Sequence, residues 1–282
     1  MSKIRAGVIG WPVSHSLSPV LHGYWLKHYG IDGEYVRLPA EQGEFLGVVS
    51  RANHEGFAGL NVTVPHKEAA FKLADKRDKA AQITGAVNLL VFGKDRIEGR
   101  NTDHAGLKKS LEESLGENAL TGKTVILLGA GGAARGAILA LGEMGVGKIH
   151  ILNRHQERAE ILARALGLSV KAKLMPGPLA AFASVASEAA ILINSTSAGM
   201  TGNEKPAVQL SPLPVAAAVL DIVYNPLETQ LLKEAAARGH KVIDGLGMLM
   251  HQAAPSFEAF FGVKPEVTPG LRAALVEAMH GA

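Results

Sequence analysis

The stretch Thr124-Val125-Ile126-Leu127-Leu128-Gly129-Ala130-Gly131-Gly132-Ala133-Ala134-Arg135 decides the fold of this 282-residue chain. It joins an apolar run that predicts a buried strand, a glycine-rich turn, and a sequence able to start a helix. Gly129, Gly131 and Ala134 fit the spacing G-x-G-x-x-G/A, in which glycine lets the backbone turn sharply and approach a ligand closely. The free N–H groups and the dipole of the following helix would then face phosphates. The stretch therefore predicts a pyrophosphate-binding turn.

A second apolar run, Lys148-Ile149-His150-Ile151-Leu152, follows the predicted helix. This order of strand, helix and strand is the βαβ unit that a dinucleotide-binding turn requires. Glycine pairs also make ordinary turns, so a purely structural connection is the alternative. The context favours dinucleotide binding.

The residues after this second run indicate which dinucleotide is bound. An NAD site usually places Asp or Glu about 20 residues after the first glycine, where it binds the ribose 2′-OH. Here the segment reads Asn153-Arg154-His155-Gln156-Glu157-Arg158, with no acid at the strand tip. Arg154 and Arg158 lie four residues apart and would share a helix face, and guanidinium groups suit a phosphate. The segment favours NADP, with its 2′-phosphate, over the alternative that both arginines are solvated surface charges.

Composition narrows the class of protein. Hydrophobic residues make up 47% and aromatic residues 5%, which predicts cores built on aliphatic side chains. The net charge of +3 is carried by dispersed residues, without the basic patch interleaved with aromatics that nucleic-acid binding would need. Disulfides and thiolate chemistry are excluded because there is no cysteine, and the 11 histidines lack a metal-binding spacing, so we expect no metal site. With no signal peptide and no apolar run of membrane-spanning length, we expect a cytoplasmic protein that does not enter a membrane.

Strand and helix patterns alternate along the chain, which predicts parallel sheets and an α/β fold. Length favours two domains. In the first part, strands are expected over 6–10, 35–38 and 59–64, a hairpin over 87–92 and 96–99, and helices over 19–29, 42–53, 67–73 and 103–115. In the rest, strands are expected over 124–128, 148–152, 190–194, 219–223 and 241–243, and helices over 133–144, 154–166, 228–238, 247–261 and 269–279.

Polar residues gather at strand ends in the first part. Ser14, Ser16 and Ser18 lie between a strand and a helix, where hydroxyls suit an anion or a polyol, although capping is the alternative and Ser18 is a plausible N-cap. On the strand 59–64, Leu60, Val62 and Val64 should point one way and Asn61 and Thr63 the other. These two polar side chains would form a ligand wall or, alternatively, line an exposed sheet face.

Three further polar residues, Asn88, Asp103 and Lys67, also have structural interpretations. Asn88 interrupts an apolar run, and since a buried amide needs partners it either fixes a loop or binds a ligand. Taken alone, Asp103 would be a helix N-cap and Lys67 a surface lysine.

Together these residues resemble the shikimate dehydrogenase family over nearly the full length. The resemblance rests on ordered motifs: Ser16-Leu17-Ser18-Pro19, Asn61-Val62-Thr63-Val64-Pro65-His66-Lys67, Gly85-Ala86-Val87-Asn88, Asn101-Thr102-Asp103, Gly129-Ala130-Gly131-Gly132-Ala133, Asn153-Arg154, Asn194-Ser195-Thr196-Ser197-Ala198-Gly199-Met200, Asp221-Ile222-Val223-Tyr224-Asn225-Pro226, and Gly245-Leu246-Gly247-Met248-Leu249 with Gln252.

The resemblance implies a two-domain α/β enzyme. Residues 1–103 plus 246–282 would form a substrate-binding domain to which the C-terminal helices return, and residues 104–245 a Rossmann-type NADP-binding domain, with a cleft between. The implied reaction is the reversible, NADP-dependent reduction of 3-dehydroshikimate to shikimate in chorismate and aromatic amino acid biosynthesis. The implied partner is this small-molecule substrate, and the protein would be a monomer or homodimer.

The resemblance also implies roles for particular residues. Lys67 and Asp103 would form the catalytic pair, with Lys67 as general acid and base. Substrate contacts would come from Ser16, Ser18, Thr63, Lys67, Asn88, Asp103, Tyr224 and Gln252, with Asn61 nearby, and the two serines would hold the carboxylate. Cofactor contacts would come from Gly129, Ala130, Gly131, Gly132, Ala133, Asn153, Arg154, Arg158, Thr196, Ile222 and Gly245.

The chain departs from the family pattern at two positions: His155 stands where Thr is usual, and Leu89 replaces a Thr after Asn88. Neither departure removes a residue that is predicted to bind substrate or cofactor. A quinate/shikimate or aminoshikimate dehydrogenase is the alternative within the family. A non-catalytic NADP-binding sensor is the alternative of another class, but it would have no reason to keep Lys67, Asp103 and the two serines.

Overall fold

The computed structural model describes residues 3–280 and divides them into two compact units. The first unit comprises residues 3–103 and 250–280, and the second comprises residues 104–249. The chain passes back into the first unit within helix α10 (Leu246–Phe261).

The first unit is built on a six-stranded mixed sheet in the order β2-β1-β3-β5-β6-β4. Strand β1 pairs in parallel with β2 and β3, whereas β3 with β5 and β5 with β6 are antiparallel. The carboxyl ends of β1, β3 and β6 and the start of β5 therefore meet at one edge of the sheet. The strands are β1 (Ile4–Gly10), β2 (Gly33–Pro39), β3 (Gly59–Val62), β4 (Lys76–Arg77), β5 (Leu89–Phe92) and β6 (Ile97–Arg100).

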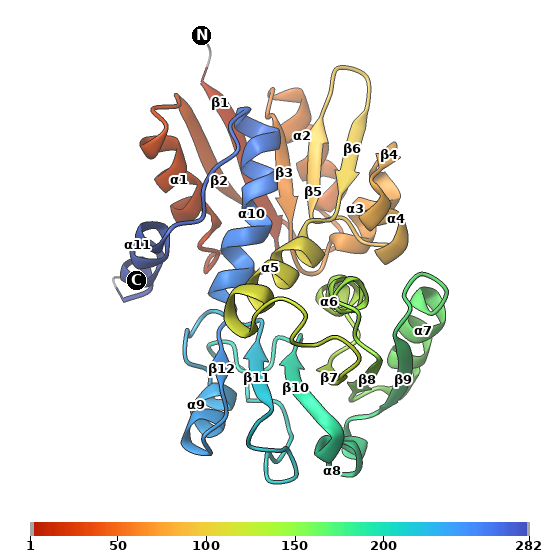
Figure 1. Cartoon of the computed structure of the whole chain (residues 1–282). Helices are drawn as coiled ribbons and strands as arrows, with labels where there is room; N and C mark the ends of the chain where they lie inside the picture. The colour runs from red at the N-terminus through yellow and green to blue at the C-terminus, as the bar shows by residue number, and fades with distance from the viewer. Residues whose placement is uncertain (1–2, 281–282) are drawn as a thin grey trace. The chain divides into compact units, whose positions relative to one another are not determined.

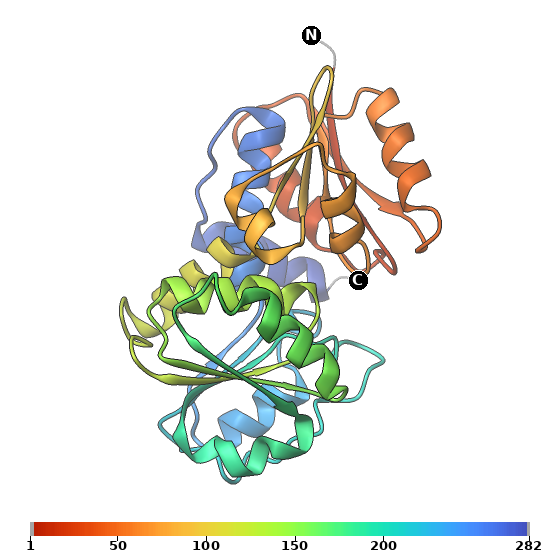
Figure 2. The same ribbon diagram turned by 90° about the vertical axis from the view of Figure 1, so that its right-hand side faces the viewer.

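Helices cover both faces of this sheet. Figures 1 and 2 show α10 against one face and α2 on the opposite one. Leu60 and Val62 of β3 pack in a buried apolar cluster with residues of α2, such as Val49. The helices are α1 (Ser18–His28), α2 (Phe45–His54), α3 (Lys67–Leu73), α4 (Lys79–Thr84), α10 and α11 (Pro269–His280), and α5 (Asp103–Leu115) begins at the unit boundary.

Aromatic side chains form a second core in the first unit, which the low aromatic content did not predict. Trp25 of α1 packs edge-on to Phe257 of α10 at 5.3 Å between ring centroids. His22 is fully buried and stacks on Tyr35 at 3.9 Å with an interplanar angle of 3°. Burial lowers the pKa of His22 from 6.5 to about 3, so this imidazole is neutral at physiological pH.

The second unit is a six-stranded sheet in the order β12-β11-β10-β7-β8-β9, and every pair is parallel. This is the strand order of a Rossmann fold. Figure 2 shows α6 and α7 on one face of the sheet and α8 and α9 on the other. The elements are β7 (Thr124–Leu128), α6 (Gly132–Glu143), β8 (Lys148–Asn153), α7 (Gln156–Leu166), β9 (Lys173–Pro178), α8 (Phe182–Val185), β10 (Ala189–Asn194), β11 (Ala218–Asp221), α9 (Gln230–Ala237) and β12 (Val242–Ile243), with short 3₁₀ turns at Leu179–Ala181 and Ala186–Glu188.

Three local predictions were wrong. Leu17, not Ser18, is the N-cap of α1, and Ser18 is the first residue of the helix. Val64 does not share the buried face of Leu60 and Val62: β3 ends at Val62, and Val64 is 65% exposed. The helix expected from Arg154 begins at Gln156, so the two arginines share no helix.

Among residues 3–280, no helix is long and apolar enough to cross a lipid bilayer. Over the same residues, no group of three or more histidine, aspartate or glutamate side chains is arranged to hold a metal ion.

Candidate active site

Lys67 and Asp103 form a close ion pair in the first unit. Lys67 begins α3 and Asp103 begins α5, and Nζ of Lys67 lies 2.5 Å from Oδ2 of Asp103. The side chains are 14% and 5% exposed, so the pair is largely removed from water but can still be reached. The N-terminal dipole of α5 also favours a carboxylate at Asp103. The surface alternative for Lys67 does not apply, because this side chain is largely buried and paired with Asp103.

Asn88 holds the other carboxylate oxygen of Asp103. Its Nδ2 donates to Oδ1 of Asp103 and to Oγ1 of Thr102, both at 2.9 Å, and to Oε1 of Gln252 at 3.3 Å. The backbone N–H of Thr102 donates to Oδ1 of Asn88 at 2.8 Å, and Thr102 Oγ1 donates to the carbonyl of Gln252 at 2.8 Å. The structure thus brings Asn88, Asp103 and Gln252 together with Lys67, and it adds Thr102 as a link between them.

Asn61 lies beside this group but is committed to internal partners. Its Oδ1 accepts a hydrogen bond from Tyr35 at 2.8 Å, and its Nδ2 donates to the carbonyl of Asn88 at 3.1 Å and to Oγ of Ser256 at 2.7 Å. It is 7% exposed, so the exposed-face alternative was wrong for this residue. Both donors of this amide are engaged, and its oxygen already accepts one hydrogen bond.

The loop between β1 and α1, residues 11–17, lies at the same edge of the first unit's sheet. The backbone N–H of Trp11 donates to the carbonyl of Val64 at 2.9 Å, which ties the β1–α1 loop to the β3–α3 loop. Ser16 is half-buried and Ser18 is buried, and the N–H of Ser18 donates to Oγ of Ser16 at 3.3 Å. Thr63 is half-buried and follows β3, and a Cβ on Gly10 would lie 2.3 Å from its methyl group. Gly10 is therefore needed for Thr63 to approach β1.

The glycine turn of the second unit has the geometry of a phosphate cradle. Gly129 has φ of +107°, a region that favours glycine, and a Cβ there would lie 2.8 Å from Oγ of Ser195. Gly131 is the N-cap of α6 and has no side-chain cap, and the space around its missing Cβ is open. Ala134 is fully buried, as the close-packing third position of the motif requires. A helix N-terminus without a side-chain cap, beside open space at Gly131, fits a pyrophosphate.

The other predicted cofactor residues lie at the carboxyl edge of the same parallel sheet. Thr196 and Ile222 are half-buried beyond β10 and β11. Tyr224, a predicted substrate residue, is half-buried two residues after Ile222. Gly245 follows β12, and a Cβ there would lie 2.1 Å from the carbonyl oxygen of Ile222, so only glycine fits. Asn153 ends β8, with Arg154 exposed beyond it and Arg158 exposed on α7.

Asp221 is a buried carboxylate at the end of β11. Its sequence did not indicate a role, although it is the first residue of the motif that runs to Pro226. It is 0% exposed, and within the described residues it accepts from Asn194, Thr229 and the N–H of Val223 at 2.7 to 3.1 Å, all of them uncharged. Burial raises the pKa of Asp221 from 3.8 to about 6, against the opposing effect of these hydrogen bonds.

This raised pKa makes the stability contribution of Asp221 depend on pH. Between about pH 4 and pH 6 the folded state holds a proton that the unfolded state has lost. Below this window the carboxyl is protonated in both states and does not change the unfolding free energy. Above it, the folded state is destabilised by the full free energy of ionising the buried group. A pKa moved from 3.8 to about 6 corresponds to roughly 3 kcal/mol. We expect Asp221→Asn to gain about that much in unfolding free energy, relative to wild type, on going from pH 4 to pH 7.5. Guanidinium denaturation of both proteins at both pH values measures it, and an equal difference at the two pH values would contradict it.

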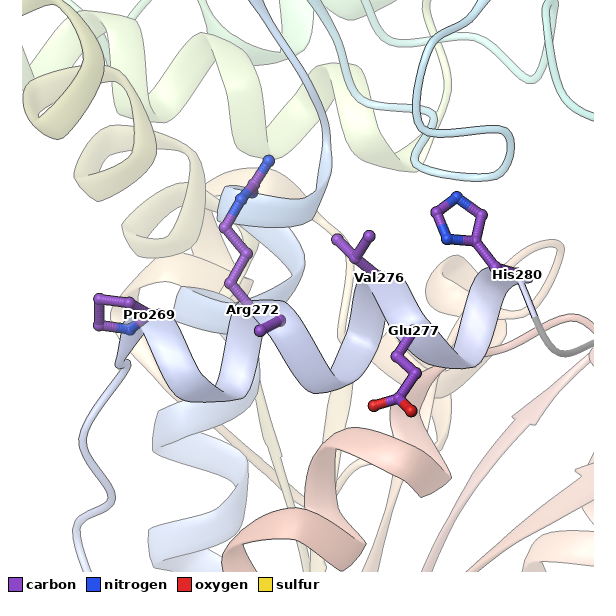
Figure 3. Close-up of a pocket in the computed structure, with 6 residues that line it drawn as sticks. Pro269, Arg272, Val276, Glu277 and His280 are labelled. Atoms are coloured by element: carbon purple, nitrogen blue, oxygen red, sulfur yellow. The ribbon is translucent and has the colours of Figure 1, made fainter.

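An open hollow of about 540 Å³ lies along α11, and none of the residues that line it is a predicted site residue. Its lining comes from one helix, and Figure 3 shows Arg272, Val276 and His280 projecting from the same side of it. The hollow contains none of the paired groups described above.

The fold and the two groups of residues define a class: a protein with a Rossmann-type dinucleotide-binding unit and a second α/β unit that carries a lysine–aspartate pair. Three family profiles match the chain: "Shikimate dehydrogenase substrate binding domain" over residues 8–90, "Shikimate / quinate 5-dehydrogenase" over 110–223, and "Shikimate 5'-dehydrogenase C-terminal domain" over 245–275. The chain belongs to the shikimate dehydrogenase family.

Individual relatives agree with this assignment. The chain is 49% identical over 98% of both sequences to "Shikimate dehydrogenase (NADP(+))" of Methylobacterium radiotolerans. It resembles the solved shikimate 5-dehydrogenase of Thermus thermophilus in complex with NADP(H) and shikimate, with a TM-score of 0.83, 34% identity and 99% of both chains covered. It also resembles the quinate dehydrogenase of Corynebacterium glutamicum in complex with NAD, with a TM-score of 0.87, 30% identity, and 98% and 99% covered.

Proposed function

We propose that this chain catalyses the reversible, NADP-dependent reduction of 3-dehydroshikimate to shikimate, a step in aromatic amino acid biosynthesis. The observation that carries the proposal is the sheltered Lys67–Asp103 pair in a chain that also has an uncapped glycine turn before α6. Relatives named NADP-dependent shikimate dehydrogenases, such as the one at 49% identity, support it.

The proposed catalytic role of Lys67 follows from what the reaction needs. When bound, NADPH would supply the hydride to the ring ketone, and the resulting alkoxide needs a proton. Lys67 would donate that proton from Nζ, and in the reverse direction it would take it from the substrate hydroxyl. Asp103, held from its other side by Asn88, keeps the ammonium group in place.

For the substrate, we propose that the hydroxyls of Ser16 and Ser18 hold the carboxylate, and that Thr63, Asn88, Gln252 and Tyr224 contact the ring substituents. Asn61 fits better as a positioning residue, because its amide is occupied by Tyr35, Ser256 and the Asn88 carbonyl.

For the cofactor, we propose that the turn from Gly129 to Ala133 holds the pyrophosphate and that Arg154 and Arg158 hold the 2′-phosphate. Asn153, Thr196, Ile222 and Gly245 would complete the site. The domain limits 1–103 plus 246–282 and 104–245, the cytoplasmic location and the monomeric or homodimeric state stay predictions of the sequence.

A panel of four substrate pairs tests the proposed function. Purified protein is assayed for oxidation of shikimate or quinate with NADP⁺ or NAD⁺. We expect turnover largely confined to shikimate with NADP⁺. Faster turnover of quinate with NAD⁺ would instead place the chain with the quinate dehydrogenases. Binding of NADP⁺ without turnover of either substrate would contradict the proposed reaction.

A further inference from the structure

Asp221 stands at the start of a chain of hydrogen bonds that leads to the glycine turn. Its Oδ1 accepts from Nδ2 of Asn194 at 2.8 Å, and the two residues face each other on the paired strands β11 and β10. Nδ2 of Asn194 also donates to the carbonyl of Ala198 at 3.0 Å, so both donors of this amide are used on one side.

The opposite side of the Asn194 amide fixes the loop after β10. Its Oδ1 accepts from both the N–H of Thr196 at 3.1 Å and the hydroxyl of Thr196 at 2.7 Å. The hydroxyl accepts in turn from the N–H of Ala198 at 3.1 Å. If the amide turned over, its NH₂ group would face the N–H of Thr196, donor against donor. An acceptor at Asp221 stabilises this same orientation, because it takes the second N–H of the Asn194 amide.

This loop packs directly on the glycine turn. A Cβ placed on Gly129 would lie 2.8 Å from Oγ of Ser195 and 2.9 Å from the methyl group of Thr196. The hydroxyl of Ser195 donates to the carbonyl of Leu128 at 2.6 Å, one residue before Gly129. The position of Thr196 therefore helps to determine the shape of the turn.

We propose that Asp221 is a positioning residue for the dinucleotide: it acts through Asn194 and Thr196 to hold the loop after β10 against the Gly129 turn. This inference rests on the proposed function, since it takes NADP as the ligand of that turn. A buried carboxylate held by uncharged partners reduces stability, as argued above for pH above 6. The presence of this destabilising carboxylate is explained if its oxygen, as a hydrogen-bond acceptor, orients the loop after β10.

Two substitutions separate the acceptor from the charge. Asp221→Asn keeps an oxygen that can accept from Asn194, whereas Asp221→Leu removes it. Binding of NADP⁺ to the full-length protein is measured by isothermal titration calorimetry without substrate, and kcat and KM for each substrate are measured by turnover. We expect Asp221→Leu to raise the Kd for NADP⁺ about 10-fold or more, since leaving a buried N–H of Asn194 without its acceptor costs about 1–3 kcal/mol. Its KM for shikimate should stay within about twofold and Asp221→Asn should bind NADP⁺ within about twofold of wild type.

Leu231→Ala is the matched control for lost stability. Leu231 is 1% exposed in the core of the same unit. It takes no part in the hydrogen bonds that link Asp221, Asn194 and Thr196. If it raises the Kd as much as Asp221→Leu, or if Asp221→Leu binds NADP⁺ like wild type, the proposal is overturned. Should Asp221→Leu fail to fold, Asn194→Ala removes the residue that links Asp221 to Thr196. We expect it to raise the Kd for NADP⁺ by the same factor. Failure of wild type itself to bind NADP⁺ would instead contradict the proposed function.

Discussion

Lys67→Ala should lower kcat for shikimate oxidation by about 10²–10⁴-fold, with a modest change in KM. The loss corresponds to roughly 3–5 kcal/mol of activation free energy. The physical reason is that Nζ of Lys67 is held 2.5 Å from Asp103 in a largely buried setting. The variant keeps the hydrogen bond from Asn88 to Asp103, so the other proposed substrate contacts should be retained.

Steady-state kinetics with saturating NADP⁺ measures this effect, and Lys72→Ala supplies the control. Lys72 lies on the same helix, is exposed, and gives up the same charge. We expect the control to keep wild-type kcat and added ethylamine to restore part of the activity of Lys67→Ala only. Unchanged kcat in Lys67→Ala would remove this lysine from the chemistry.

The parts of the fold that were predictable are those encoded locally. The apolar run before Gly129 and the helix after it follow from contiguous residues, and the structure places β7 and α6 there. The hairpin of β5 and β6 likewise follows from two short runs around a turn. In such segments, local pattern and tertiary packing require the same conformation.

The elements that were missed have sequences that argue against them. Strand β9 contains Pro176 and Pro178, which normally count against a strand. It is tolerated because β9 is an edge strand that pairs with β8 alone. Strand β4 and helix α4 are too short to show a period.

The site was predictable as a set of residues but not as a set of contacts. Lys67 and Asp103 are 36 residues apart and Asn61 and Ser256 are 195 apart, and no local pattern encodes such pairs. Asn61 consequently looked like a ligand residue, because an amide on a strand shows its polarity in the sequence but not its partners. Asp221 escaped notice for the same reason: its significance lies in its burial among uncharged groups.

The second large effect concerns the choice between NADP and NAD. We expect Arg154→Ala to lower kcat/KM for NADP⁺ by about 10- to 100-fold while leaving kcat/KM for NAD⁺ within about twofold, because a charge-assisted bond to phosphate is worth about 1.5–3 kcal/mol. Arg154 directly follows β8 whereas Arg158 lies within α7, so the two guanidinium groups would approach the 2′-phosphate from different elements. We expect Arg158→Ala to have the smaller effect, and the double variant to approach equal use of the two cofactors.

The control separates a specific phosphate contact from the general charge of the helix. Arg164 is exposed in the last turn of α7, so Arg164→Ala removes one positive charge from the far end of the same helix. Long-range attraction alone would weaken NADP⁺ use in all three single variants and would fade with added salt, since exposed charges are screened beyond about 10 Å at 0.1 M salt. A direct contact predicts no effect of Arg164→Ala and a loss in Arg154→Ala that persists at moderate salt. Equal losses in Arg154→Ala and Arg164→Ala would show that the strand tip attracts the cofactor without recognising its 2′-phosphate.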